Sequence, residues 1–185
     1  METLDCIHSR QSYGIFKPDP VSHELIETML SAAVQAPNHY KVRPWRFIVI
    51  SGNGLYKLGD VMAKSLAMKT PGLPAEALDK ERAKPLRAPL IIAVGVDKPS
   101  EPRVVETENI CASAAASQNI LLAARELGLS AYWRTGPAAL DPLVKEFLGL
   151  TADQHLIAFL YIGFPENFPA PIERPGFGDR TTWVE

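Results

Sequence analysis

The 185-residue sequence lacks the short motifs that mark the common nucleotide, metal and hydrolase sites. It has no GxGxxG after a hydrophobic run and no GxxxxGK[ST], which excludes the usual glycine-rich phosphate loops. Its histidines have neither HExxH spacing nor nearby cysteine partners, and no GxSxG is present. A chain without a metal cluster or a nucleophile elbow often relies on a cofactor for its chemistry. We therefore predict no metal site and a reaction that depends on a cofactor.

Cysteines, basic clusters and long apolar runs are also scarce. Cys6 and Cys111 form no CxxC motif or disulfide framework, and Cys111, set among alanines, is predicted to be a small buried residue. The net charge is −2 without a Lys/Arg block, so nucleic acid and anionic membranes are unlikely partners. No apolar run approaches the roughly 20 residues that span a bilayer. The start "METLDCIHSR" is too polar for a signal peptide, and we expect a cytoplasmic protein.

The length suits a single domain over residues 1–185. Helical patterns alternate with apolar strand patterns, which favours an α/β or α+β layered domain. Helices are expected at 2–9, from a Ser22 cap towards Pro37, through Leu55–Leu66, at 75–84, at 106–127 and after Asp141-Pro142. Strands are expected at 46–51, 88–96, 130–136 and 155–163. The proline-rich segment 164–185 is expected to be an extended tail that wraps a partner subunit.

Two segments have the composition of ligand-binding loops. "SRQSYG" offers the planar donors of Arg10 and the hydroxyl of Ser12, which suit a phosphate or a polyol. "AYWRTG" places Arg134 and Thr135 at the end of a strand, where open sheets often bind ligands. An exposed helix-end arginine and a surface ion pair are the ordinary alternatives, and composition alone does not separate them.

The segment "APNHYKVRPWRFIVI" (36–50) joins a polar loop to an apolar run. Phe47–Ile50 is predicted to be a buried strand of a sheet that is covered on both faces. The loop before it gathers Asn38, His39, Lys41 and Arg43. It is either a surface turn or a loop that holds something flat and anionic.

The order of these segments resembles that of the nitroreductase family of FMN-dependent oxidoreductases. "IHSRQSYGIF", a helix, and "AAVQAPNHYKVRPWRFIVI" are followed by the small-residue helix with "CASAAAS", then "GLSAYWRTG" and "LYIGFPE". The sequence looks most like the short, minimal bacterial branch. The resemblance implies an α+β nitroreductase-like fold with a central, mostly antiparallel sheet flanked by helices. It further implies an intertwined homodimer with two FMN sites at the subunit interface.

The resemblance assigns FMN-binding positions residue by residue: Arg10, Gln11, Ser12, Asn38, His39, Lys41, Trp133, Arg134 and Thr135. The first three would meet the ribityl chain and phosphate, the next three would approach the flavin from the partner subunit, and the last three would complete the site. Gln11 replaces a common second arginine, and Lys41 and Arg43 replace the usual Asn and Gln. Arg174 and Arg180 are both candidates for the usual C-terminal phosphate-binding arginine.

The implied activity is hydride transfer from NAD(P)H through FMN to nitro-aromatic or quinone-like acceptors by a ping-pong mechanism. No catalytic side chain is assigned, because the flavin is the centre of the chemistry. Two alternatives use the same fold. One is an FMN-holding protein with little turnover, and the other is flavin-dependent dehalogenation or dehydrogenation. Residues 63–87 are the one candidate lid, and their sequence indicates no particular chemistry.

Overall fold

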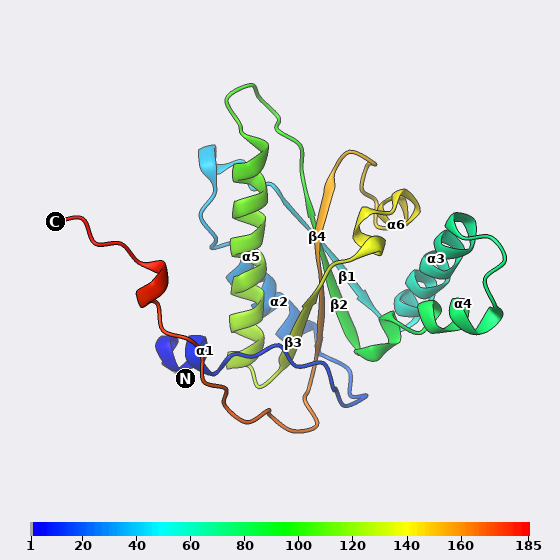
Figure 1. Ribbon diagram of the computed structural model, residues 1–185, viewed down its shortest axis with the longest axis horizontal. Coiled ribbons are helices and arrows are strands. Elements are labelled where there is room, and N and C mark those ends of the chain that lie inside the picture. The colour runs from blue at the N-terminus through cyan, green and yellow to red at the C-terminus, as the bar shows by residue number, and fades with distance from the viewer. Residues whose placement is uncertain (1) are drawn as a thin grey trace.

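The computed structural model describes residues 2–185, which form an antiparallel sheet with helices on both faces (Figure 1). The α-helices are α1 (Thr3–Ser9), α2 (His23–Ala33), α3 (Asn53–Lys69), α4 (Ala75–Arg82), α5 (Glu106–Glu126) and α6 (Pro142–Phe147). The strands are β1 (Trp45–Ser51), β2 (Leu90–Val96), β3 (Ser130–Arg134) and β4 (His155–Gly163). The strand order is β1-β2-β4-β3, and all neighbours are antiparallel. Of the two layered classes expected, α+β is therefore the correct one.

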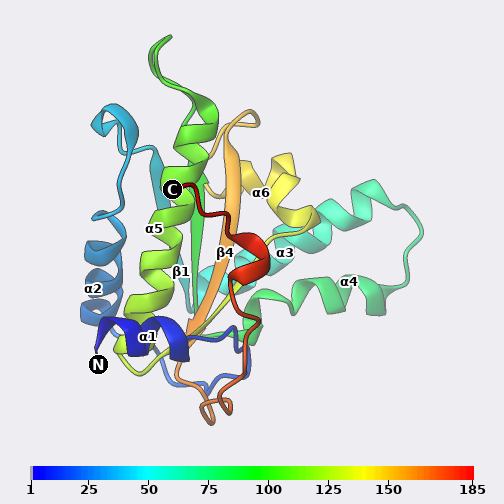
Figure 2. The same cartoon turned by 60° about the vertical axis from the view of Figure 1, so that its left-hand side comes forward.

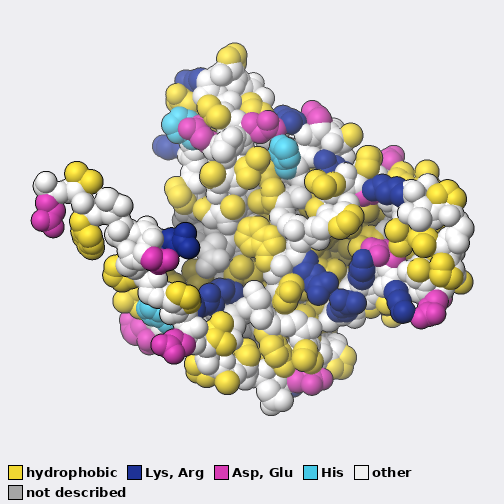
Figure 3. Space-filling model, viewed as in Figure 1, with side chains coloured by type: hydrophobic (Ala, Val, Ile, Leu, Met, Phe, Trp, Pro, Cys, Tyr) yellow, Lys and Arg dark blue, Asp and Glu magenta, His cyan; other side chains and the backbone are white. Residues whose placement is uncertain are grey.

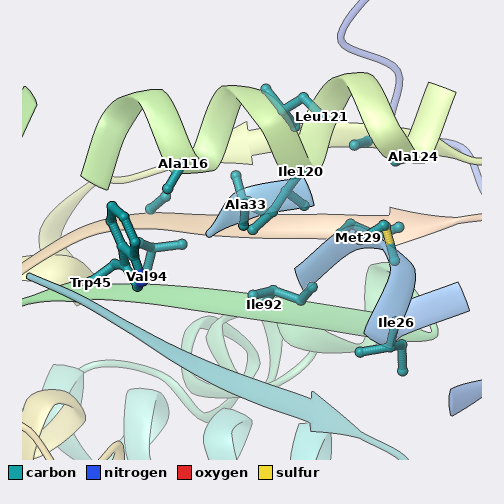
Figure 4. Close-up of a cluster of buried hydrophobic side chains, with 14 of the residues drawn as sticks. Ile26, Met29, Ala33, Trp45, Ile92, Val94, Ala116, Ile120, Leu121 and Ala124 are labelled. Atoms are coloured by element: carbon teal, nitrogen blue, oxygen red, sulfur yellow. The ribbon is translucent and has the colours of Figure 1, made fainter. Parts of the chain in front are cut away.

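Alternating side chains of the central strands supply two cores, one on each face of the sheet. Figure 2 shows α2 and α5 on one side of the sheet, and α3, α4 and α6 on the other. On the first side, Ile92 and Val94 of β2 face Ala116 and Ile120 of α5 (Figure 4). On the second side, Ile91 of β2 lies in a cluster with residues of α3 and α6.

The helix boundaries follow from local signals in the sequence. The Ser22 side chain accepts a hydrogen bond from the Leu25 amide, and α2 ends before Pro37 as predicted. After α5, Gly128 has a φ of 77°, the left-handed conformation expected of a residue that ends a helix. The small residues of α5 lie in part against the sheet, where Ala116 and Ala124 are fully buried. These alanines let the helix approach the strands closely.

Two predictions about burial are wrong. Phe47–Ile50 is not covered on both faces, because β1 is an edge strand: Val49 is 42% exposed, and Phe47 and Ile48 are only half-buried. Cys111 is exposed, because it lies on the face of α5 that points away from the sheet, whereas Cys6 is buried. In both cases the composition is apolar, but composition does not specify which face of a strand or helix is covered by the rest of the chain.

The C-terminal segment leaves the body of the molecule. Its start is anchored to the N-terminal segment by a bridge between Phe16 and Pro165 and by a hydrogen bond from the Lys17 amide to the Phe164 oxygen, 2.8 Å. Residues 170–185 are exposed throughout, and after Arg174, which contacts the N-terminal segment, the chain projects away from the body (Figure 3). None of the helices in the described part of the chain has the length and apolar character needed to cross a membrane.

Candidate active site

Two arginines from opposite ends of the chain lie together at the start of β3. Helix α1 ends at Ser9 with Arg10 as its C-cap, and the following backbone runs beside β3, where Ser12 pairs with Ala131. Arg174 of the tail donates a hydrogen bond from Nη2 to the Arg10 backbone oxygen, 3.1 Å. Within residues 2–185, neither guanidinium forms an ion pair with a carboxylate. Two neighbouring cations without counter-ions are the arrangement expected of a binding site for a phosphate.

The electrostatics of Arg10 agree with such a site. Burial and, next, the charge of Arg174 lower the pKa of Arg10 from its ordinary value. Both causes make the charged guanidinium less favourable than it is in water, and a bound anion would remove that penalty. Arg180 differs, because it is exposed and pairs with its neighbour Asp179 at 3.0 Å. Of the two C-terminal candidates, Arg174 is therefore the one that lies beside Arg10.

The other two residues of the first segment have different environments. Gln11 donates from Nε2 to the Ala170 oxygen, 2.8 Å, so its amide holds the tail in place. Ser12 is exposed, and its hydroxyl is open to solvent. Basic side chains gather across the lower middle of the face shown in Figure 3, from the base of the tail towards α3 and α4. This distribution favours a negatively charged ligand along that side.

The three predicted residues of β3 do not share one environment. Trp133 donates from Nε1 to the Ile157 oxygen, 3.1 Å, and packs against the core on the α2 and α5 side. The side chain of Arg134 lies on the opposite face, where its guanidinium is 4.8 Å from the ring centroid of Tyr132 and 5.6 Å from that of Tyr161. The alternation of a strand causes this split. The segment therefore presents a tryptophan to one core and a cation to a cavity on the other face.

That cavity has a volume of about 360 Å³ and lies between the end of β3 and helices α3 and α6. Arg134 and Thr135 line it together with Lys69 and Tyr161. Lys69 and Lys84, from the 63–87 segment, lie at its wall. The segment proposed as a lid therefore forms part of the wall of this cavity. Its contribution comes mainly from α3 and from the turn after α4.

A buried carboxylate organises this wall. Asp141, whose side chain is only 3% exposed, caps α6 by accepting hydrogen bonds from the amides of Leu143 (2.9 Å) and Val144 (3.2 Å). It also accepts hydrogen bonds from Ser65 and Lys69 of α3. Burial alone would raise the pKa of Asp141, but these hydrogen bonds outweigh it and lower that pKa. The charged carboxylate thereby joins α3 to α6 beside the cavity.

The predicted partner-facing loop lies at the other end of α5. Here Asn38 Oδ1 accepts a hydrogen bond from the Arg43 amide, 2.9 Å, and His39 Nε2 is 4.0 Å from Glu108 Oε2. Tyr40, Lys41 and Arg43 have φ values of 49°, 56° and 50°, which are uncommon for residues with side chains. A strained loop with exposed donors is typical of a functional site.

One chain does not bring the two halves of the predicted site together. Ser9, next to Arg10, accepts a hydrogen bond from Arg125 near the end of α5, 3.2 Å, whereas His39 lies beside Glu108 near its start. At the helical rise of roughly 1.5 Å per residue, about 25 Å separates Glu108 from Arg125. The His39 loop and the arginine pair could therefore serve one ligand only if a second copy supplied one of them.

Sequence reasoning missed Lys69, Asp141 and Tyr161. Two signals were available: Ser65 and Lys69 are four residues apart on a helix, and Asp141 precedes a proline at a helix start. Tyr161 is a single hydroxyl in an otherwise apolar strand. None of these signals predicts that the three side chains meet, because the contact depends on how α3 and α6 pack against the sheet.

Comparison with known proteins assigns this architecture to a family. A family model described as the nitroreductase family matches residues 7–164. The chain belongs to the nitroreductase family. It is 30% identical over 167 residues to the protein named "Putative NAD(P)H nitroreductase YdjA" of Escherichia coli strain K12, covering 90% of each chain. It is 31% identical over 179 residues to "Putative NAD(P)H nitroreductase YfhC" of Bacillus subtilis strain 168, covering 96% of this chain and 92% of that one.

A solved nitroreductase-like family protein from Bacillus cereus has the same fold, with a TM-score of 0.83. It is 28% identical, and the match covers 100% of this chain and 97% of that one. The expected nitroreductase-like α+β fold is thereby confirmed. The expectation of an NAD(P)H-dependent oxidoreductase is confirmed at the level of the family.

Proposed function

We propose that this nitroreductase-family protein uses FMN to transfer electrons from NAD(P)H to nitro-aromatic or quinone-like acceptors by a ping-pong mechanism. We further propose that it works as a homodimer with an FMN site at each end of the subunit interface. The observation that supports the cofactor is the contact of Arg174 with the Arg10 backbone, which places two arginines without a carboxylate partner within residues 2–185 in one region, where the charge of Arg174 lowers the pKa of Arg10. Each guanidinium can donate hydrogen bonds to the oxygens of a phosphate monoester.

Under this proposal, the residues of the candidate site have separate roles. Arg10 and Arg174 would hold the phosphate, the Ser12 hydroxyl would donate to the neighbouring polyol, and Gln11 would keep the tail in place. FMN, when bound, supplies the acceptance of a hydride and its delivery to a second substrate. The backbone of Trp133–Thr135 would border the ring, while the cavity beside Arg134 and Thr135 would exclude water from part of the site.

The second copy completes the site in this proposal. The separation along α5 leaves Asn38, His39 and Lys41 far from the Arg10 of their own chain. An antiparallel pairing of two α5 helices would bring each loop to the arginine pair of the other subunit. The exposed outer face of α5, which includes Cys111, is available for such a pairing within the single chain.

Absorbance and turnover test the proposal directly. The purified protein is expected to be yellow, with a flavin absorbance band, and to oxidise NADPH when a nitrofuran or menadione is added. Arg10→Ala is expected to purify largely without FMN. Bound FMN without NAD(P)H oxidation would instead indicate a flavin-holding protein. A colourless wild-type protein that gains no flavin on reconstitution would refute the proposed cofactor.

A further inference from the structure

The first part of the C-terminal tail runs antiparallel to the segment that follows α1 (Figure 1). As the tail moves away from β4, each contact reaches a residue closer to α1. Hydrogen bonds join the two segments at successive points, from the Lys17 amide to the Phe164 oxygen (2.8 Å), from the Glu166 amide to the Ile15 oxygen (3.4 Å), from Gln11 Nε2 to the Ala170 oxygen (2.8 Å) and from Arg174 Nη2 to the Arg10 oxygen (3.1 Å).

Between these hydrogen bonds, a side chain of the tail contacts α5. The guanidinium carbon of Arg125 lies 4.2 Å from the centroid of the Phe168 ring. A cation over an aromatic ring is attracted to the negative face of the ring. Phe168 is 49% exposed, so this contact covers part of a ring that is otherwise open to solvent. The middle of the tail segment is therefore held to α5 as well as to the N-terminal segment.

The same guanidinium also contacts the end of α1. Arg125 Nε donates a hydrogen bond to Ser9 Oγ, 3.2 Å. The Ser9 hydroxyl donates its own proton to the Cys6 oxygen, 3.4 Å, which leaves its lone pairs to accept from Arg125. Since Ser9 directly precedes Arg10, this hydrogen bond fixes the chain next to the first arginine of the proposed phosphate site.

Arginine is suited to these two contacts. A planar guanidinium can donate hydrogen bonds within its plane while an aromatic ring lies over its face. Arg125 is in the last turn of α5, where a cation is favoured by the carbonyl groups at the helix end. Arg125, Phe168 and Arg10 line the same small hollow between α1, α5 and the tail. One half-buried side chain thus joins three segments beside Arg10.

We propose that Arg125 is a positioning residue for the phosphate-binding arginines. It holds the end of α1 through Ser9 and the tail through Phe168. It thereby limits the movement of Arg10 relative to Arg174. The effect on FMN rests on the proposed function, whereas the fastening of the tail does not.

Riboflavin, which lacks the phosphate, separates this role from a general effect on folding. The dissociation constants of FMN and riboflavin are measured on flavin-free protein by quenching of flavin fluorescence. Arg125→Gln should weaken FMN binding about tenfold and Phe168→Leu about threefold, while riboflavin binding changes by less than about twofold. Equal losses for both flavins would indicate a purely structural role and overturn the proposal. A loss in Arg125→Gln without one in Phe168→Leu would make Arg125 a direct phosphate ligand, which also overturns it.

Hydrogen exchange tests the fastening of the tail without any flavin. The Lys17 and Glu166 amides donate between the two segments, so their exchange requires the tail to open. Both amides should exchange about three- to tenfold faster in Arg125→Gln and in Phe168→Leu. Unchanged exchange in both variants would overturn the proposal. Far-UV circular dichroism checks folding, and Phe168→Leu keeps the test valid if Arg125→Gln does not fold.

Two substitutions elsewhere serve as matched controls. Phe177→Leu changes a tail phenylalanine that is 73% exposed, and Lys57→Gln removes a positive charge from an exposed position of α3. Both controls should keep the wild-type ratio of FMN to riboflavin affinity and the wild-type exchange. A change of the same size in the controls would show that tail composition or net charge is responsible, and it would overturn the proposal.

The route through the tail is tested in an Arg174→Gln background. There, Phe168→Leu should have little further effect on FMN binding, because the tail no longer carries its phosphate ligand. A full additional loss would overturn the proposal. A wild-type protein that binds neither flavin would refute the proposed function, and the exchange of Lys17 and Glu166 would then decide alone whether Arg125 fastens the tail.

Discussion

Arg174 donates a hydrogen bond to the backbone oxygen of Arg10, which is 164 positions earlier in the sequence. This contact joins the exposed tail to the turn after α1 and brings the charge of Arg174 close enough to lower the pKa of Arg10. Like charges at such a position are unfavourable unless a counter-ion is bound. The hydrogen bond fixes the tail at this point, and a bound anion would offset the repulsion between the two charges.

We expect Arg174→Gln to weaken FMN binding by about 10- to 100-fold, because a charge-assisted hydrogen bond to a phosphate is lost. The dissociation constant is measured by quenching of flavin fluorescence. Arg180→Gln is the matched control, since Arg180 is an exposed tail arginine that pairs with Asp179. Similar losses in the two variants would show that only the overall charge of the tail matters.

Mixed dimers test whether the partner supplies His39. A dimer of one Arg10→Ala chain and one His39→Ala chain should regain one intact site, because the intact His39 comes from the first chain and the intact Arg10 from the second. A wild-type chain paired with the Arg10→Ala/His39→Ala double variant should have one defect in each site. Two different affinity tags allow isolation of the mixed dimers. The number of tightly bound FMN molecules per dimer is then measured. Equal counts in both dimers would contradict an interface site.

Asp141 should make stability depend on pH. Its pKa is lowered in the folded protein, so its contribution is fully present above its unfolded pKa of about 4 and is lost as the pH falls through the folded value. Asp141→Asn should lower the free energy of unfolding at pH 7 by about 1–3 kcal/mol and reduce its decline below pH 4. Urea denaturation at several pH values measures both effects. Asp179→Asn, on the exposed tail, should change neither noticeably.

Gly59 should be intolerant of a side chain. A Cβ at this position of α3 would lie 2.2 Å from the Arg82 backbone oxygen, so α3 and the end of α4 would have to move apart. Gly59→Ala is expected to destabilise the protein by about 1–3 kcal/mol. Gly54→Ala, on the same helix, meets only the Ile50 side chain at 3.2 Å and should cost less. Thermal unfolding compares the stability of the two variants.

The sequence was sufficient for most of the fold, because its local signals are strong. The Ser22 cap, Gly128 and the periodic apolar residues of α3 each determine structure within a few residues. Local signals do not determine the strand order, because β4 pairs with both β2 and β3 through contacts between residues distant in sequence. The exposure of Val49 likewise depends on β1 being at the edge, which no local pattern reveals.

The site was predictable only in parts. Composition identified the segments of Arg10, His39 and Arg134, and the family resemblance gave them a ligand. The structure adds that Trp133 and Arg134 point to opposite faces, and that Arg174 rather than Arg180 reaches Arg10. The first fact follows from the pleat of the strand, and the second follows from the path of the tail. Residue types alone determine neither.

The strand order has a consequence for the synthesis of the chain. β4 is made last but occupies an inner position, between β2 and β3. A chain growing from the ribosome therefore has no place for β3 until residue 163 has emerged, and the segment of Ser12 that pairs beside β3 must wait with it. Since Arg174 emerges later still, the proposed phosphate site is among the last parts of the protein that can form.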